Sequence, residues 1–146
     1  MKQSDTWSCM ACVAAMIANE PLQNVIDFIG HDGSDWDPNS KSPFRVAGFS
    51  IKEIAKFFLD RDFLLGTFFI IKDGGKLDDD EGKFPVAIPL NHLAMVTVKS
   101  ERFHPNIKHV IYWDGKKVWD SNPEVEDGRP LTDYYIYEWW PILRLI

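Results

Sequence analysis

Cysteine is scarce in this chain, with only Cys9 and Cys12 among its 146 residues. Two cysteines three positions apart do not make the disulfide framework of a small secreted domain, so we expect a reducing, cytoplasmic environment. Secretion is disfavoured. An apolar run over residues 10–18 follows Lys2, but Asp5 interrupts its approach and no small-residue cleavage pattern follows it.

Long apolar runs and positive charge are also missing. No segment approaches the roughly 20 apolar residues of a membrane-spanning helix, so we predict no membrane span. Lys and Arg number 16 against 22 Asp and Glu, and the net charge of −6 gives no basic face for a nucleic acid. No repeat or linker divides the chain, so we predict one domain over residues 1–146. The sequence leaves the oligomeric state open.

Three segments in the first half have the composition of helices. Ser8 stands in the N-cap position before an Ala-rich segment over residues 9–18. Apolar residues at helical spacing predict a second helix over residues 21–28. Ser50 and Glu53 form a capping box that predicts the start of a third.

The second half has the pattern of short strands. We predict strands over residues 63–71, 85–90, 93–98, 107–113, 117–120 and 134–145. The dipeptide Asp114-Gly115 indicates a hairpin turn between two of them. Residues 30–48 and 72–83 are polar and predict loops. Helices followed by a mainly antiparallel sheet predict an α+β fold.

Cys9 is the candidate nucleophile, because it is the first residue of the first predicted helix. A helix N-terminus favours negative charge, and the reactive form of cysteine is the thiolate. A neighbouring imidazole completes the activation and later supplies a proton to the leaving group. The oxyanion of acyl transfer needs fixed donors. The backbone N–H of Cys9 is one candidate, and the side-chain amide of Gln3, six positions earlier, is another.

These residues resemble a known family. Gln3 followed by Cys9-Met10-Ala11-Cys12-Val13-Ala14-Ala15-Met16-Ile17 resembles the opening of papain-like cysteine peptidases, closest to the bacteriocin-processing (double-glycine leader) branch. His92, which opens the segment 92–98, is similar to the histidine at the start of a strand in that family. Asp120, within the segment 118–123, is similar to the third residue at the end of a later strand. The resemblance covers the chain from Gln3 to about Asp133.

The resemblance implies a papain-like fold and a cysteine peptidase that acts on a protein or peptide substrate without cofactor or metal. It implies Cys9 as nucleophile, His92 as base, Asp120 as the residue that orients the base, and Gln3 as oxyanion donor. The sequence departs from the family at two places. Met10 stands where a small residue is usual, and residues 101–108 lengthen the interval between His92 and Asp120.

The other three histidines, and a second candidate for the orienting residue, are alternatives to this assignment. His31 lies in the polar loop, where we expect it to be solvated, and His104 lies in the inserted segment. His109 alternates within a strand, where a histidine is often structural. Asp120 also has the place of a turn residue. Asn122 remains the alternative to Asp120 as the orienting residue.

Different functions are also open. Cys9 and Cys12 form a Cys-x-x-Cys pair, but too few residues precede it for a thioredoxin-like fold, and we expect Cys12 to face the core. A zinc site lacks a second close pair of ligands. The chain is alternatively a papain-like binding module, such as an inhibitor or effector acting on a host protein, or a thiol acyltransferase.

Overall fold

The structure is a computed structural model that describes residues 1–2, 8–34, 48–79, 81–100 and 108–145. The helices come first, namely α1 (Cys9–Ala18), α2 (Leu22–Ile29) and α3 (Ile51–Asp60). The strands follow: β1 (Phe63–Leu65), β2 (Phe69–Gly75), β3 (Ala94–Lys99), β4 (Lys108–Trp113), β5 (Val118–Trp119) and β6 (Ile136–Arg144). Two short 3₁₀ helices are η1 (Glu81–Lys83) and η2 (Leu131–Asp133). The predicted α+β class is confirmed.

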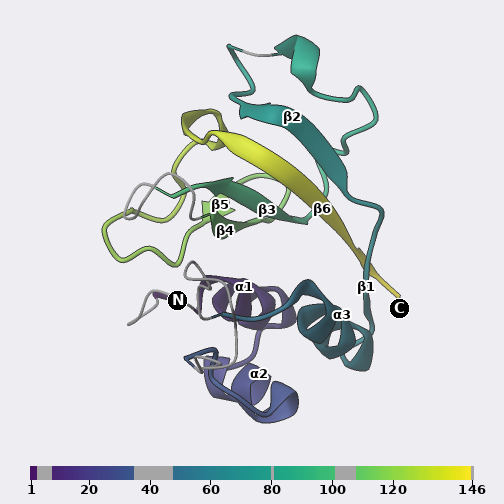
Figure 1. Ribbon diagram of the computed structural model, residues 1–146, viewed down its shortest axis with the longest axis vertical. Coiled ribbons are helices and arrows are strands. Elements are labelled where there is room, and N and C mark those ends of the chain that lie inside the picture. The colour runs from purple at the N-terminus through teal and green to yellow at the C-terminus, as the bar shows by residue number, and fades with distance from the viewer. Residues whose placement is uncertain (3–7, 35–47, 80, 101–107, 146) are drawn as a thin grey trace, which may run out of the picture.

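The molecule has a helical layer and a sheet. The sheet has the strand order β1-β6-β3-β4-β5, with β2 also paired to β6, and each of these pairs is antiparallel. In Figure 1 the three helices lie together below the sheet. One apolar cluster lies between the helices and the sheet, and a second is built mainly from β2, β3, β4 and β6. Within the first cluster α1 packs against β4, which brings the two elements that carry the site together.

The helix boundaries follow from local chemistry. Ser50 Oγ accepts from the backbone N–H of Glu53 at 3.2 Å, while the Glu53 carboxylate accepts from the Ser50 N–H at 2.9 Å, so the predicted capping box is confirmed. Asn19, in the left-handed conformation at φ 55°, ends α1, and Gly30 at φ 96° ends α2. Among the described residues no single helix is long and apolar enough to cross a membrane, and α1 and α2 meet that test only together, across a bend of 111°.

The predicted strands and loops of the second half need three corrections. The segment 63–71 is not one strand, because residues 66–68, between β1 and β2, are not in a strand. The segment 85–90 forms turns rather than a strand, with the Ile88 N–H bonded to Pro85 O. Proline has no N–H to give to a ladder, so two prolines in six residues favour turns. The polar loop predicted over residues 72–83 begins later, since β2 continues to Gly75.

The hairpin between β4 and β5 forms as predicted. The Asp114 N–H bonds to Lys117 O at 3.1 Å, and Gly115 has φ 97°, a conformation that a side chain disfavours. Tyr112 pairs with Trp119 across the hairpin. The hairpin begins at Lys108 and ends at Asp120, so its two ends lie on the same side of the sheet.

Candidate active site

Cys9 is the first residue of α1, as predicted, and its side chain is partly exposed. Ser8 occupies the N-cap position, but its side chain makes no capping hydrogen bond to the helix. Ser8 Oγ instead lies 3.8 Å from Cys12 Sγ. Cys12 is fully buried, which confirms its predicted place in the core. The positive end of the α1 dipole is thus next to the Cys9 sulfur.

The imidazole beside Cys9 belongs to His109, on β4. His109 forms a side-chain hydrogen bond with Cys9 and a second one, at 2.6 Å from its Nε2 to Oδ1, with Asp120. The packing of α1 on β4 explains the first contact and the β4–β5 hairpin explains the second. Three side chains from three elements of the chain therefore meet in the order Cys9, His109, Asp120.

This environment stabilises the protonated imidazole. Burial by itself lowers the pKa of His109, but the hydrogen bonds to Asp120 and Cys9 and the charges of both outweigh it and raise that pKa to about 9. The ring is only 14% exposed, so solvent screens these interactions weakly. His109 is consequently a cation at neutral pH in this structure.

Asp120 is 2% exposed and its carboxylate is held from three directions. Oδ1 accepts from His109 and from the backbone N–H of Asn122 at 2.9 Å, and Oδ2 accepts from the Tyr134 hydroxyl at 2.8 Å. Burial tends to raise the pKa of this carboxyl, but its hydrogen bond and charge interaction with His109 lower it overall. The buried group is therefore an ionised acceptor with fixed partners.

The N-terminal end of the chain is tied to the same place. Lys2 Nζ donates to the backbone oxygens of Asp120 at 2.8 Å and Val125 at 2.7 Å, and it pairs with the Asp127 carboxylate at 3.0 Å. Gln3, the predicted oxyanion donor, lies outside the described residues. Lys2 thus fastens the chain beside Asp120 one position before Gln3.

The prediction that Asp120 orients His92 is wrong in this structure. His92 Nε2 bonds to the backbone oxygen of Ile142 at 2.7 Å, and the Asp120 carboxylate is bonded to His109 instead. The physical reason is that α1 packs on β4, which carries His109. His92 instead lies just before β3, the strand between β4 and β6. Among the predicted site residues, Cys9 and Asp120 are brought together through His109, and His92 serves the contact with β6.

The other candidate site residues of the sequence analysis, where they are described, make other contacts. Asn122 Oδ1 accepts from the Glu124 N–H at 3.0 Å, so its side chain shapes the turn, while its backbone supports Asp120. His31 was predicted to be solvated, but its Nε2 lies 2.5 Å from Glu53 Oε2 and its ring stacks on Phe49. His104 lies outside the described residues.

Sequence reasoning missed His109, although one signal for it was available. The turn at Asp114-Gly115 predicts a hairpin, and His109 and Asp120 stand near its two ends, 11 positions apart. A hairpin brings its two ends together, so it places His109, rather than His92, close to Asp120. Tyr134, which follows η2, had no comparable signal.

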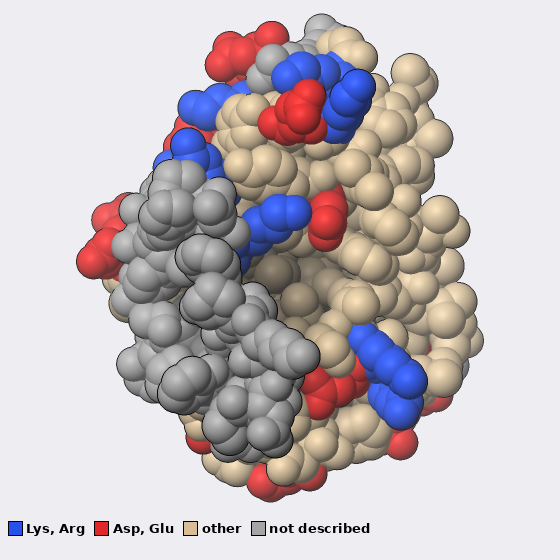
Figure 2. Space-filling model, in the orientation of Figure 1, with Lys and Arg blue, Asp and Glu red and all other residues tan. Residues whose placement is uncertain are grey.

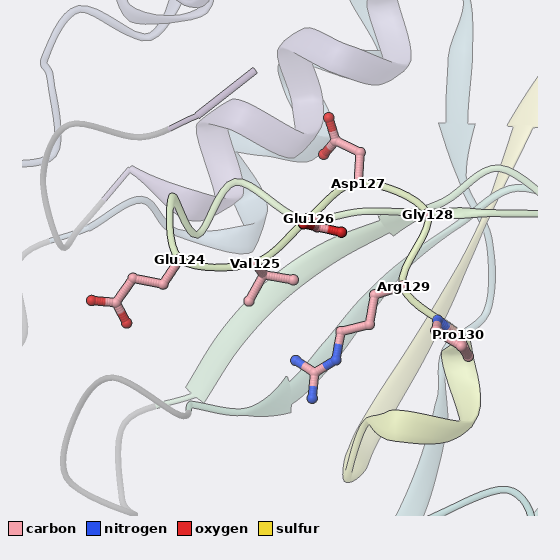
Figure 3. A pocket seen from close by; sticks show the side chains of 7 residues that line it. All are labelled: Glu124, Val125, Glu126, Asp127, Gly128, Arg129 and Pro130. Carbon is pink, nitrogen blue, oxygen red and sulfur yellow. The ribbon is translucent and has the colours of Figure 1, made fainter.

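Two pockets lie near these elements. One is lined by residues 124–130, in the loop that follows Asp120 (Figure 3). The other lies at the C-terminal end of α1 and includes Met16, Tyr112 and Trp119. Within the described part of the chain, no three His, Cys, Asp or Glu side chains are grouped so that they could hold a metal ion.

No family model, no curated protein and no solved structure matches this chain.

Proposed function

We propose that this chain is a cysteine peptidase of the papain-like kind, with Cys9 as nucleophile, His109 as acid and base, and Asp120 as the residue that orients His109. One observation carries the proposal: the His109 ring bonds to Cys9 on one side and to the buried Asp120 carboxylate on the other. A nucleophile, a base and a third group that fixes the base are the elements of thiol acyl transfer. A helix that bears the cysteine and a sheet that bears the histidine are consistent with the resemblance to papain-like peptidases.

The proposed reaction begins with the Cys9 thiolate and the His109 imidazolium. The sulfur attacks the carbonyl carbon of a peptide or isopeptide bond and forms a tetrahedral oxyanion. The N–H of Cys9 donates to that oxygen, with Gln3 as the proposed second donor. His109 gives its proton to the leaving amine as the C–N bond breaks. It then takes a proton from water, whose oxygen attacks the thioester, and the sulfur leaves as thiolate.

The electrostatics of the site favour this sequence. A pKa of about 9 for His109 means that the ring carries the required proton at neutral pH. The leaving amine needs a proton donor in the first step, and a cationic imidazole supplies it. Asp120 stays ionised and stabilises that cation, without taking the proton itself.

The place of the site suits a polypeptide substrate. Cys9 and His109 belong to the boundary between α1 and the sheet, and Figure 2 shows the surface hollowed between these two layers. An extended peptide that lies along this boundary presents its carbonyl to the N-terminus of α1. Cys9 and Cys12 are not joined in a disulfide bond, and a thiol nucleophile works best where it stays reduced, so we place the protein in the cytoplasm.

The test is labelling with an electrophilic peptide probe, such as a peptidyl vinyl sulfone, followed by mapping of new protein N-termini in a digest. We expect adduct on Cys9, new N-termini with the wild-type protein, and neither with Cys9→Ala. Cys12→Ala is the matched control and keeps both signals. Absence of labelling at Cys9 would refute the proposal. Labelling with transfer of an acyl group to an added amine, but no hydrolysis, would replace peptidase by acyltransferase.

A further inference from the structure

We propose that Tyr134 is a positioning residue of this site, which holds the Asp120 carboxylate in the orientation that presents Oδ1 to His109. The inference rests on the proposed function for its consequence in catalysis. Its structural part rests on the contacts of Tyr134 alone. Tyr134 follows η2 and is 3% exposed, so its hydroxyl meets protein groups rather than bulk water.

The carboxylate of Asp120 has a different partner on each oxygen. Oδ1 faces His109 and the N–H of Asn122, and Oδ2 accepts from the Tyr134 hydroxyl at 2.8 Å. A carboxylate held at one oxygen alone still turns about its Cβ–Cγ bond, because that torsion has a broad energy profile. A bond to the second oxygen removes this freedom, so the Tyr134 hydroxyl fixes the direction in which Oδ1 accepts from His109.

Arg129 sets the direction of the Tyr134 hydrogen bond. The Arg129 guanidinium lies 4.7 Å from the centre of the Tyr134 ring and also forms a side-chain hydrogen bond with the phenol. Arginine has only donors, so the phenol oxygen accepts from Arg129 and its single hydrogen is left for Asp120. Figure 3 shows Arg129 extending away from the loop 124–130, and its Nε bonds to Asp133 Oδ2 at 3.3 Å.

The hydroxyl of Tyr134, rather than its ring, is the group that positions Asp120. A phenylalanine fills almost the same volume, and burying a hydroxyl is favourable only where it finds partners. The partners of this hydroxyl are Asp120 and Arg129, so its contribution passes through Asp120 to His109. The other charged groups at the pair come from separate elements, namely Cys9 from α1 and Lys2, which bonds to the backbone oxygen of Asp120.

The test compares Tyr134→Phe with Tyr135→Phe. Tyr135 is the matched control, because its hydroxyl donates to the backbone oxygen of Asp73, an exposed residue of β2. For Tyr134→Phe we expect kcat to fall on the order of tenfold, the scale of a lost hydrogen bond to a charged group, with KM nearly unchanged. The looser carboxylate also weakens its bond to His109, so the alkaline limb of the pH profile moves to lower pH. Tyr135→Phe changes neither.

A second readout works without turnover. Titration of the His109 ring followed by NMR should show a lower pKa in Tyr134→Phe than in the wild type, and no change in Tyr135→Phe. An unchanged titration overturns the inference. A lowered pKa in a protein without peptidase activity supports the positioning and refutes only the proposed function.

Arg129→Leu covers the case in which Tyr134→Phe does not fold. This change removes the donor to the phenol oxygen and leaves the Tyr134 hydroxyl free to point elsewhere, so we expect the same shift of the His109 titration in smaller size. Its matched control is Asp133→Asn, which removes the carboxylate that accepts from Arg129 Nε and leaves the phenol contact. Equal titrations in Arg129→Leu and wild type overturn the part assigned to Arg129.

Discussion

His109 Nε2 lies 2.6 Å from Asp120 Oδ1, and the same ring bonds to the side chain of Cys9. One imidazole therefore connects the start of a helix with the end of a hairpin. Each of the three side chains comes from a different element, and the packing of α1 on β4 is what makes them neighbours. Substitutions that remove one of these contacts without unfolding the protein test the site most directly.

The first prediction concerns which histidine acts in the reaction. We expect His109→Ala to lower kcat/KM by roughly 10³-fold or more, within the range for loss of a general acid and base. His92→Ala removes a bond to Ile142 O and should cost about 1 kcal/mol of unfolding free energy while activity stays within a few-fold. Peptide-cleavage kinetics and urea denaturation on both variants decide it. Loss of activity in His92→Ala alone would restore the assignment made from the sequence.

The second prediction concerns the thiols. Cys9 is partly exposed and bonded to His109, whereas Cys12 is 0% exposed. Iodoacetamide at pH 6 should therefore alkylate Cys9 first, because an accessible thiolate paired with a cation reacts while a buried thiol does not. Mass spectrometry of tryptic peptides reads the site. His109→Ala should slow the reaction at Cys9, and equal slow labelling of both cysteines would contradict the ion pair.

The third prediction is a pH dependence of stability. The pKa of His109 is raised from 6.5 to about 9 in the folded state, so its contribution is fully present below about 6.5 and is lost as pH rises through about 9. The rise from 6.5 to about 9 corresponds to about 3 kcal/mol of unfolding free energy. Urea denaturation between pH 6 and 10 should show this decline in the wild type. His109→Gln is the control, and a parallel decline in that variant would place the cause elsewhere.

The fourth prediction separates the two candidates for the third residue. Asp120→Asn removes the charge that stabilises the His109 cation and should lower kcat by about 10²- to 10⁴-fold, as in other triads. Asn122→Ala removes the bond that the Asn122 side chain accepts from the Glu124 N–H and keeps the Asn122 backbone bond to Asp120. Its activity should stay within a few-fold of wild type. The reverse order of the two losses would transfer the role to Asn122.

Local signals in the sequence predicted much of the fold. The helix starts at Cys9 and Ile51 and the turn at Asp114-Gly115 follow from residues a few positions apart, and they were found where expected. The division between β1 and β2 at residues 66–68 was missed, because both strands are set by their pairing with β6, which is distant in the sequence. Contacts of that kind are set by the packing of the whole chain.

The candidate site shows the same division. Cys9 was proposed from its helix start and Asp120 from the family resemblance, and the structure brings the two side chains together through His109. The sequence pattern favoured His92, which opens its segment, over His109, which lies within a strand; in the structure His92 lies just before β3 and His109 is in β4. What separates them is that α1 packs on β4, a contact that no local pattern encodes. Tyr134 was missed because its bond to Asp120 depends on how the segment after η2 packs, which no local pattern encodes.

The last prediction concerns Lys2 and Gln3, and Gln3 remains the predicted oxyanion donor. Lys2 donates to Asp120 O, to Val125 O and to Asp127, so it fastens the chain immediately before Gln3. Gln3→Ala should lower kcat by about 10²-fold, as for loss of one oxyanion donor. Lys2→Met should lower kcat less, because it loosens the donor without removing it. Lys83→Met is the control, since its ammonium bonds to Gly74 O away from the site.

A double-mutant cycle then tests whether the two residues act together. If Lys2 works by placing Gln3, Lys2→Met has no further effect once Gln3 is alanine, and the two losses are not additive. Steady-state kinetics on one cleaved peptide measures all four proteins. Additive losses would mean that Lys2 acts on Asp120 through its backbone oxygen. A kcat within a few-fold of wild type for Gln3→Ala would remove Gln3 from the mechanism and leave the backbone N–H groups at the start of α1 as the oxyanion donors.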